Sequence, residues 1–394
     1  MKQADLHYEK CLTGLANSIL KRFGIPPVGP TLPPADMLLE KHRRNTVVLL
    51  LDGMGKSVLE GNLEEGGFLR SHLVDTYYSV FPPTTVAATT SLLTGLDPCG
   101  HSWLGWDCFY PDIDKNVTVY FNTIQGTKEP AADYPVAETI CPYKSILERI
   151  NEAGGVAYGV SPYMEPYPKV GRPAKPDSHR PSDLSGPSKP DVTLPKTWKQ
   201  IVDRVRELCE YPGEKFIYAY WEEPDHTMHN SGCFSKSTRR VLRRIESRLV
   251  ELAEQLTDTQ IIITADHGHI NSRGVALESY PQITDCLVRM PSIEPRALNL
   301  FVKPGRESEF EHLFEEAFGE EYILMSREEV LKKKLFGNSE EHEQFRRMLG
   351  DYIGIAVSDL TIYRTEKDAA KHIGVHAGLT EDEMVIPLIS IECN

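Results

Sequence analysis

Three aspartates stand at the ends of apolar runs that predict buried strands. Asp52 follows TVVLLL, Asp225 follows KFIYAYW after a short turn, and Asp266 follows QIIITA. Ligands of open parallel sheets bind outside the carboxyl ends of the strands, so these carboxylates are expected to converge on one crevice. An aspartate at a strand end is also a common turn or helix-cap residue. For any one of the three alone, that ordinary role is the better interpretation.

Two histidines shift the balance toward a metal site. His267 directly follows Asp266, and His229 lies four residues after the second aspartate. A lone histidine is usually a surface or core residue, but two Asp/His pairs just past buried strands are much less expected by chance. Carboxylate oxygen and imidazole nitrogen together suit zinc, and also manganese or iron. We interpret His226 and His269, which flank these pairs, as neighbours that orient the ligands.

The segment FPPTTVAATTSLLTG predicts an anion site or a nucleophile. Val86 to Thr94 is able to form a helix, and Gly95 can end it. Either Thr84 or Thr85 then stands at the helix N-terminus, where free N–H groups and the helix dipole favour an anion. A threonine hydroxyl bound to a metal there could ionise and attack phosphorus. Taken alone, the segment is better explained by a threonine that caps the helix.

The elements that position these residues alternate in type. Continuous apolar strands are expected at 46–51, 216–221 and 261–265, with a shorter one ending at Val160. Helical patterns lie between them, and the strongest, over 237–256, places its apolar residues in one stripe among charges. Strands that alternate with helices predict an α/β fold with a mainly parallel sheet.

Two segments interrupt this alternation. Residues 162–195 are rich in Pro, Ser, Lys and Asp and predict a long surface excursion. From about 296 to 365, strand-like patterns alternate with short amphipathic helical patterns, which predicts a small α+β cap. We therefore expect a catalytic core formed by 1–295 and 366–394, with the cap 296–365 inserted in it.

Composition excludes several classes of protein. The chain has 394 residues and a formal net charge of -14, without a basic run, so a nucleic acid polymer is not an expected partner. No apolar stretch reaches the roughly 18 residues of a membrane span, and the N-terminus does not resemble a secretory signal. Eight scattered cysteines without a C-x-x-C pair are typical of reduced thiols. We expect a cytoplasmic protein that acts on a small molecule and binds no membrane.

Taken in order, the motifs resemble the alkaline phosphatase superfamily, and most closely its type I phosphodiesterase/nucleotide pyrophosphatase branch. The matching segments are LLLDGMG, FPPTTVAATTSLLTGL, PDHTMH, TADHG and GVHAGL. Each is short, but all five occur in the family's order and cover most of the chain. The resemblance implies an alkaline-phosphatase-like three-layer core, with a mainly parallel sheet, helices on both faces and a small α+β cap insertion.

The resemblance also implies a role for each site residue. Thr85, rather than Thr84, would be the nucleophile, because the family's threonine lies nine residues before the threonine of the T-G pair, here Thr94. His376 is chosen on this likeness alone, since within GVHAGL it could equally be an ordinary loop histidine. Two divalent ions are implied, zinc first, with manganese or iron as alternatives. One would be held by Asp52, Thr85, Asp266 and His267, and the other by Asp225, His229 and His376.

The sequence departs from the family pattern near the nucleophile. The branch usually carries an asparagine shortly after the nucleophile helix that binds a phosphoryl oxygen, and here the matching place holds Trp106 or Asp107. We expect these two residues to contact the substrate. Thr85 is followed by Val86, where the branch often has an aromatic residue that helps to seat a nucleobase, so nucleotide specificity does not follow from the resemblance.

The implied function is metal-dependent hydrolysis of a small phosphate ester, by a phosphodiesterase or nucleotide pyrophosphatase that forms a phospho-threonine intermediate. A phosphomonoesterase or a phosphonate hydrolase of the same superfamily is the alternative. Sulfatases of the superfamily use a modified Cys or Ser, and phosphosugar mutases use a serine and a larger substrate domain. A non-catalytic metal- or phosphate-binding protein is the alternative from another class, and the presence of all seven implied metal ligands argues against it.

Overall fold

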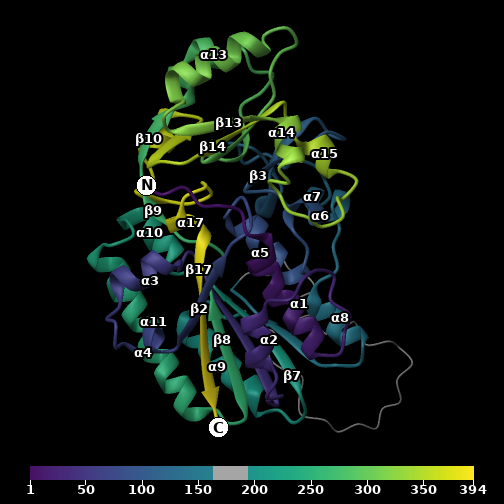
Figure 1. Cartoon of the computed structure of the whole chain (residues 1–394), viewed down its shortest axis with the longest axis vertical. Helices are drawn as coiled ribbons and strands as arrows, with labels where there is room; N and C mark the ends of the chain where they lie inside the picture. Colours follow the sequence, from purple (N-terminus) through teal and green to yellow (C-terminus); the bar gives the residue numbers. More distant parts are fainter. Residues whose placement is uncertain (163–193) are drawn as a thin grey trace.

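Residues 1–162 and 194–394 are described by the structure, which is a computed structural model of the chain. The expected surface excursion at 162–195 therefore lies almost entirely outside the described residues. Figure 1 shows two large sheets at opposite ends of the long axis of the molecule, each with its own helices. The strands whose ends carry the expected site residues belong to the first of these sheets.

The first sheet has six strands in the order β2-β17-β8-β1-β7-β6. Their bounds are β1 (Asn45–Leu51), β2 (Leu73–Tyr78), β6 (Ala157–Val160), β7 (Lys215–Trp221), β8 (Thr259–Thr264) and β17 (Val385–Cys393). β6, β7, β1 and β8 are parallel, which confirms the four strands and the mainly parallel sheet expected from the sequence. β17 runs antiparallel to both β8 and β2, and this pairing was not expected.

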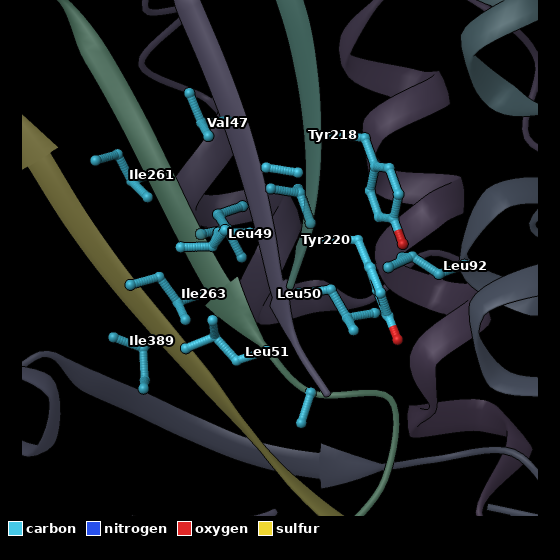
Figure 2. Packing of buried hydrophobic residues seen from close by; sticks show 14 of the residues in the cluster. Val47, Leu49, Leu50, Leu51, Leu92, Tyr218, Tyr220, Ile261, Ile263 and Ile389 are labelled. Atoms are coloured by element: carbon cyan, nitrogen blue, oxygen red, sulfur yellow. The ribbon is translucent and has the colours of Figure 1, made fainter. Parts of the chain in front are cut away.

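The central strands are apolar along their whole length because both faces of the sheet are covered. Every residue of β1, β7 and β8 is buried. Leu49 pairs with Ile263 on one face, and Leu50 pairs with Tyr220 on the other. Figure 2 shows Tyr220 on the face turned toward the helix that carries Leu92. Burial on both faces is the reason that these strands read as continuous apolar runs rather than as an alternating pattern.

Helices cover both faces, so the core has the expected three layers (Figure 1). One layer contains α1 (Leu12–Arg22), α2 (Pro33–Leu39), α5 (Thr85–Thr94) and α8 (Ile146–Glu152). The other contains α3 (Lys56–Asn62), α4 (Phe68–Ser71), α9 (Trp198–Glu210) and α11 (Lys236–Gln255). The side chain of Ser235 caps α11 by accepting from the Thr238 N–H, and the predicted apolar stripe of α11 faces inward.

The second sheet has seven strands in the order β13-β14-β12-β11-β3-β4-β5, and the paired strands run antiparallel. Their bounds are β3 (Asp107–Tyr110), β4 (Lys115–Thr118), β5 (Thr123–Ile124), β11 (Ser292–Glu294), β12 (Ala297–Leu300), β13 (Tyr322–Ser326) and β14 (Tyr352–Ala356). The helices of this part include α6 (Pro98–His101), α7 (Val136–Ile140), α12 (Pro281–Thr284), α13 (Glu307–Phe318), α14 (Arg327–Lys332) and α15 (Phe345–Met348).

This second sheet crosses the expected boundary of the cap. Residues 107–124, which we assigned to the core, join the strands of 292–356 through the pairing of Ile293 with Asp107. In contrast, β15 (Leu360–Tyr363), which we expected in the cap, pairs with β10 (Arg273–Ala276) in a separate two-stranded sheet. The cap is therefore built from two distant parts of the chain, and a single insertion at 296–365 does not describe its sheet.

Two further features concern membranes and thiols. Within 1–162 and 194–394, no helix combines the length and the apolar character that a membrane crossing requires. All eight cysteines lie in the described parts of the chain, where they are buried and unpaired.

Candidate active site

The three aspartates lie at the same edge of the first sheet, as the sequence predicts. Asp52 follows β1 directly, Asp266 lies two residues past β8, and Asp225 begins α10 (Asp225–Ser231) after β7. The Asp52 N–H donates to Trp221 O at 3.0 Å, and the Asp225 N–H donates to Asp52 O at 3.0 Å. The Gly53 N–H donates to Asp266 Oδ1 at 3.0 Å. Main-chain hydrogen bonds thus fix the three strand ends to one another.

His267 completes a first group of candidate ligands. Its Nε2 lies 3.3 Å from Asp52 Oδ1 and 3.5 Å from Asp266 Oδ2. One ligand atom from each of the three residues lies within 4.8 Å of the others. Asp52 Oδ1 and Asp266 Oδ2 are buried and have no hydrogen-bond partner within residues 1–162 and 194–394. Buried carboxylate oxygens without donors are costly unless a cation lies beside them, so the group fits a divalent metal ion.

The carboxyl groups of this cluster repel one another. Burial, and next the charges of Asp266 and Asp225, raise the pKa of Asp52 well above its usual value. Burial also raises the pKa of Asp266. Tyr220 on β7 opposes the shift at Asp52, because its hydroxyl donates to Asp52 Oδ2. A cation between the two carboxylates would favour their ionised forms, which is the state in which they bind metals.

A second group surrounds Asp225. His229 Nε2 lies 3.3 Å from Asp225 Oδ2, and His376 Nε2 lies 3.8 Å from Asp225 Oδ1. β16 (Gly374–Val375) brings His376 to the site by pairing with β9 (Ile270–Asn271). Burial raises the pKa of Asp225, but His229 and His269 outweigh it and hold that pKa well below its usual value. The structure therefore brings together all the side chains that the sequence and the resemblance selected.

The ring orientations of the three histidines suit metal binding. Each Nδ1 faces a main-chain carbonyl oxygen, at 2.8 Å in His229, 3.0 Å in His267 and 3.2 Å in His376. A carbonyl accepts only from a protonated nitrogen, so these contacts assign the proton to Nδ1 and leave the Nε2 lone pair toward the carboxylates. Burial, and then the charge of His267, lower the pKa of His376 well below its usual value, which favours the neutral ring. A neutral imidazole is the form that binds a metal.

His269, which we expected to orient a ligand, lies beside Asp225. Its Nε2 lies 2.5 Å from Asp225 Oδ1, and Nδ1 is buried without a hydrogen-bond partner in the described parts of the chain. Asp225, His267, His269 and His376 each offer one possible ligand atom, and these four atoms lie within 4.8 Å of one another. His229 approaches the other carboxylate oxygen of Asp225. His269 is thus placed either to orient Asp225 or to compete with His229 as a ligand.

Thr85 is the threonine that reaches the carboxylates. It is the first residue of α5, and its Oγ1 lies 3.4 Å from both Asp52 Oδ2 and His267 Nε2. The hydroxyl of Thr84 instead donates to Glu294 Oε1 at 2.6 Å. Gly95 ends the helix with a φ of 76°, as predicted. The geometry therefore favours Thr85 over Thr84 as the candidate nucleophile, in agreement with the resemblance.

The glycines of two motifs permit the close approach of the loops that carry the ligands. A Cβ on Gly55 of LLLDGMG would lie 2.3 Å from the Cα of Gly268. A Cβ on Gly268 of TADHG would lie 1.9 Å from the carbonyl oxygen of Asp382. Neither position can hold a side chain without moving the main chain, which explains why these motifs contain glycine at these places.

A buried ion pair lies behind the ligand loops. The Arg296 guanidinium donates to both carboxylate oxygens of Glu383, at 2.6 and 2.8 Å, and both side chains are fully buried. Glu383 also accepts from the Gly378 N–H at 2.7 Å and, through its carbonyl, from the Gly268 N–H at 2.8 Å. Gly268 follows His267, and Gly378 lies two residues after the ligand of GVHAGL. The pair thus connects both ligand loops to the second sheet.

A cavity of about 520 Å³ opens over the candidate ligands and Thr85. Its walls include Trp106 and Asp107, the two residues expected to contact the substrate. The Trp106 ring is 39% exposed and packs edge-on against Tyr120 and Phe121, at centroid distances of 5.7 and 5.8 Å. The carboxylate of Asp107 accepts from Thr118 and Gln125, so neighbouring side chains hold it against the wall.

Glu294 and Tyr220 are residues of this cavity that the sequence did not single out. Tyr220 lies within an apolar run, where its hydroxyl gives no sign of the contact with Asp52. Glu294 ends a strand of three residues, and Ile293 before it has a φ of 73°, which is unusual for a β-branched residue. A charged residue between Ile293 and Pro295 is a weak signal in the sequence. Only the fold shows that Glu294 lies in the cavity.

Comparisons with known proteins agree with this geometry. Residues 46–379 match the family model of type I phosphodiesterase/nucleotide pyrophosphatase. Murine ectonucleotide pyrophosphatase/phosphodiesterase 5, solved in complex with AMP, superposes with a TM-score of 0.61 at 18% identity, over 87% of each chain. Phosphonoacetate hydrolase from Sinorhizobium meliloti 1021, solved in complex with phosphonoformate, gives 0.65 at 15% identity, over 89% of this chain and 90% of that chain. Among curated protein sequences, no significant match was found.

The two structures share the fold of this chain, and the family match spans every candidate ligand from Asp52 to His376. The match also includes Thr85 and the glycines that bring the ligand loops together. The chain therefore belongs to the type I phosphodiesterase/nucleotide pyrophosphatase family, and it is a phosphoric ester hydrolase of the alkaline phosphatase superfamily.

Proposed function

We propose that this chain hydrolyses small phosphodiesters by attack of the Thr85 hydroxyl on phosphorus. The bond from phosphorus to one alcohol group breaks, which gives a phospho-threonine intermediate, and water then hydrolyses this intermediate and restores the Thr85 hydroxyl. The observation that carries this proposal is the place of Thr85. Its hydroxyl stands at the N-terminus of α5, in the cavity, 3.4 Å from Asp52 Oδ2 and His267 Nε2. A nucleophile in this place has carboxylate and imidazole groups on one side and space for a substrate on the other.

Two divalent ions belong to the proposal, with zinc as the first choice and manganese or iron as alternatives. One ion would be held by Asp52, Thr85, Asp266 and His267, and the other by Asp225, His229 and His376. When bound, such ions supply positive charge that lowers the pKa of the attacking hydroxyl and stabilises the departing oxygen. The buried and unpartnered oxygens of Asp52 and Asp266 support the first of these sites.

The chain's own groups position the reactants. α5 begins at Thr85, which lines the cavity, and no side chain caps this helix end. The free N–H groups of a helix N-terminus favour an anionic phosphoryl group beside Thr85. Tyr220 holds the Asp52 carboxylate through a hydrogen bond, and the main-chain carbonyls hold the three imidazole rings. Little movement of these groups is needed during the reaction, and such preorganised polar groups contribute most to catalysis of this kind.

The cavity walls support a leaving group with an apolar or aromatic part. Trp106, Tyr120 and Phe121 line one side of it. A nucleotide ester is one candidate, and a phosphonate is the alternative within the superfamily. We also propose the cytoplasm as the compartment, because eight buried and unpaired cysteines are compatible with a reducing environment.

The proposed function predicts chelator-sensitive diesterase activity. The purified chain should hydrolyse bis-p-nitrophenyl phosphate. This activity should be lost after treatment with EDTA and should return when zinc, manganese or iron salts are added. p-Nitrophenyl phosphate and phosphonoacetate, assayed in parallel, separate the monoesterase and phosphonate hydrolase alternatives. Faster turnover of either one would redirect the substrate assignment. Metal binding without turnover of any ester would favour the non-catalytic alternative.

A further inference from the structure

Glu294 is a carboxyl group of the cavity that the proposed mechanism does not use. Its Oε1 accepts from the Thr84 hydroxyl at 2.6 Å and from the Trp106 N–H at 2.9 Å. Both donors are neutral, so no cation is paired with Glu294 in these two contacts. The side chain lines the same cavity as Thr85, and Thr84 is the residue next to the candidate nucleophile. Glu294 therefore adds a carboxyl group to the wall of the cavity that would hold the substrate, beside the residue that precedes Thr85.

The fold holds Glu294 firmly in this place. It ends β11, and the residue before it pairs with Asp107 of β3, whose neighbour Trp106 supplies one of the two hydrogen bonds. Besides burial, the charge of Asp107 raises the pKa of Glu294 and that of His229 lowers it, so the Glu294 carboxyl group shares the electrostatic environment of the cavity. This wall of the cavity presents two carboxyl groups, those of Asp107 and Glu294.

We propose that Glu294 is a specificity-determining residue that excludes dianionic phosphate monoesters and thereby favours singly charged diesters. The inference rests on the proposed function, because it requires a phosphoryl group beside Thr85. A phosphate monoester carries a charge near −2 above its second pKa of about 6, whereas a diester carries −1. Repulsion by a fixed carboxylate grows in proportion to the charge of the substrate, and it grows further where the surroundings exclude water.

The variant Glu294→Gln isolates the charge. A glutamine carbonyl can accept the same two hydrogen bonds from Thr84 and Trp106, so the shape of the wall is retained. Burial raises the pKa of Glu294 to about 7, although the hydrogen bonds that its carboxylate accepts from Thr84 and Trp106 act to lower this pKa. Assays at about pH 9 therefore keep the wild-type side chain ionised. The measured quantity is kcat/KM for p-nitrophenyl phosphate divided by kcat/KM for bis-p-nitrophenyl phosphate, with the metal-loaded chain.

We expect Glu294→Gln to raise this monoester/diester ratio by at least about tenfold, and to strengthen inhibition by inorganic phosphate, which is also a dianion at that pH. Glu294→Asp keeps the charge and should keep the ratio close to that of the wild type, even if both activities fall. Glu311→Gln is a control with the same change of charge on α13, where Glu311 accepts from the Tyr352 hydroxyl outside the cavity. It should leave the ratio unchanged.

The outcomes separate this inference from the proposed function. A ratio that stays constant in Glu294→Gln while the diester is still hydrolysed would overturn the inference alone. Equal loss of both activities, with an unchanged ratio, would assign Glu294 a structural role and would also overturn it. If the wild-type chain hydrolysed no ester, the proposed function would fail and the inference with it.

Discussion

Replacing Thr85 by alanine is expected to reduce ester hydrolysis by at least about a thousandfold, while the chain keeps its fold and its metal content. The expected loss is large because the hydroxyl that forms the bond to phosphorus is removed, and the other hydroxyl beside Asp52, that of Tyr220, serves as a hydrogen-bond donor to Asp52 Oδ2. The side chain does not cap α5, because none of its hydrogen bonds closes the helix N-terminus. The unfolding midpoint should therefore change little.

Two neighbouring variants make this result specific. Thr85→Ser retains a hydroxyl and is expected to keep activity within about tenfold of the wild type. Thr84→Ala removes the bond to Glu294 and should cost far less than Thr85→Ala, because the Thr84 hydroxyl donates to Glu294, whereas the Thr85 hydroxyl lies beside Asp52 and His267. Steady-state kinetics together with metal analysis measure all three. Full activity in Thr85→Ala, or equal losses in Thr84→Ala and Thr85→Ala, would contradict the assignment of the nucleophile.

The second large effect concerns stability. Replacing Glu383 by glutamine is expected to lower the free energy of unfolding by about 3–5 kcal/mol, because the charge of Arg296 would remain buried without its partner. The guanidinium has no route to solvent, since the side chains of both residues are fully buried. The measurement is urea unfolding followed by fluorescence and circular dichroism. Coincidence of the two signals would show whether the transition is two-state.

A control pair distinguishes this effect from the loss of any ion pair. Arg248 and Glu251 form a contact of 2.5 Å on α11, with both side chains more than 40% exposed. Glu251→Gln should barely shift the unfolding midpoint, because solvent screens exposed pairs. Glu383→Gln should also weaken metal binding, because the Glu383 carboxylate accepts from the Gly378 N–H in the loop that carries His376. Wild-type stability in Glu383→Gln would show that the buried pair is not needed for the fold.

The part of the site that could be predicted from sequence has a common physical basis. Strands buried on both faces are continuous apolar runs, so the residues that follow them can be located, and Asp52 and Asp266 were found in this way. The helix after FPPTT was also predictable, because small residues lead to a glycine that ends the helix. His376 lies in a loop without a pattern of its own, so only the resemblance to the family selected it.

The remaining features depend on contacts between distant parts of the chain. The pairing of Ile293 with Asp107 builds the second sheet from two segments, and no local pattern announces it. β17 lies beside β8 although more than a hundred residues separate them. Glu294 follows Ile293 directly, so its place in the cavity depends on the first of these two pairings. For the same reason the second sheet extends beyond the proposed cap 296–365, and local patterns alone do not show this.

The most direct test of the two-metal site is a metal count on matched variants. Inductively coupled plasma mass spectrometry of the dialysed wild-type chain should find about two divalent ions per chain. Asp266→Ala and Asp225→Ala, which each remove a ligand of a different group, should each retain about one, and both should lose diesterase activity. Active wild-type chain without bound metal, or variants that still hold two ions, would contradict the assignment of Asp52, Asp225, Asp266 and their histidines to two metal sites.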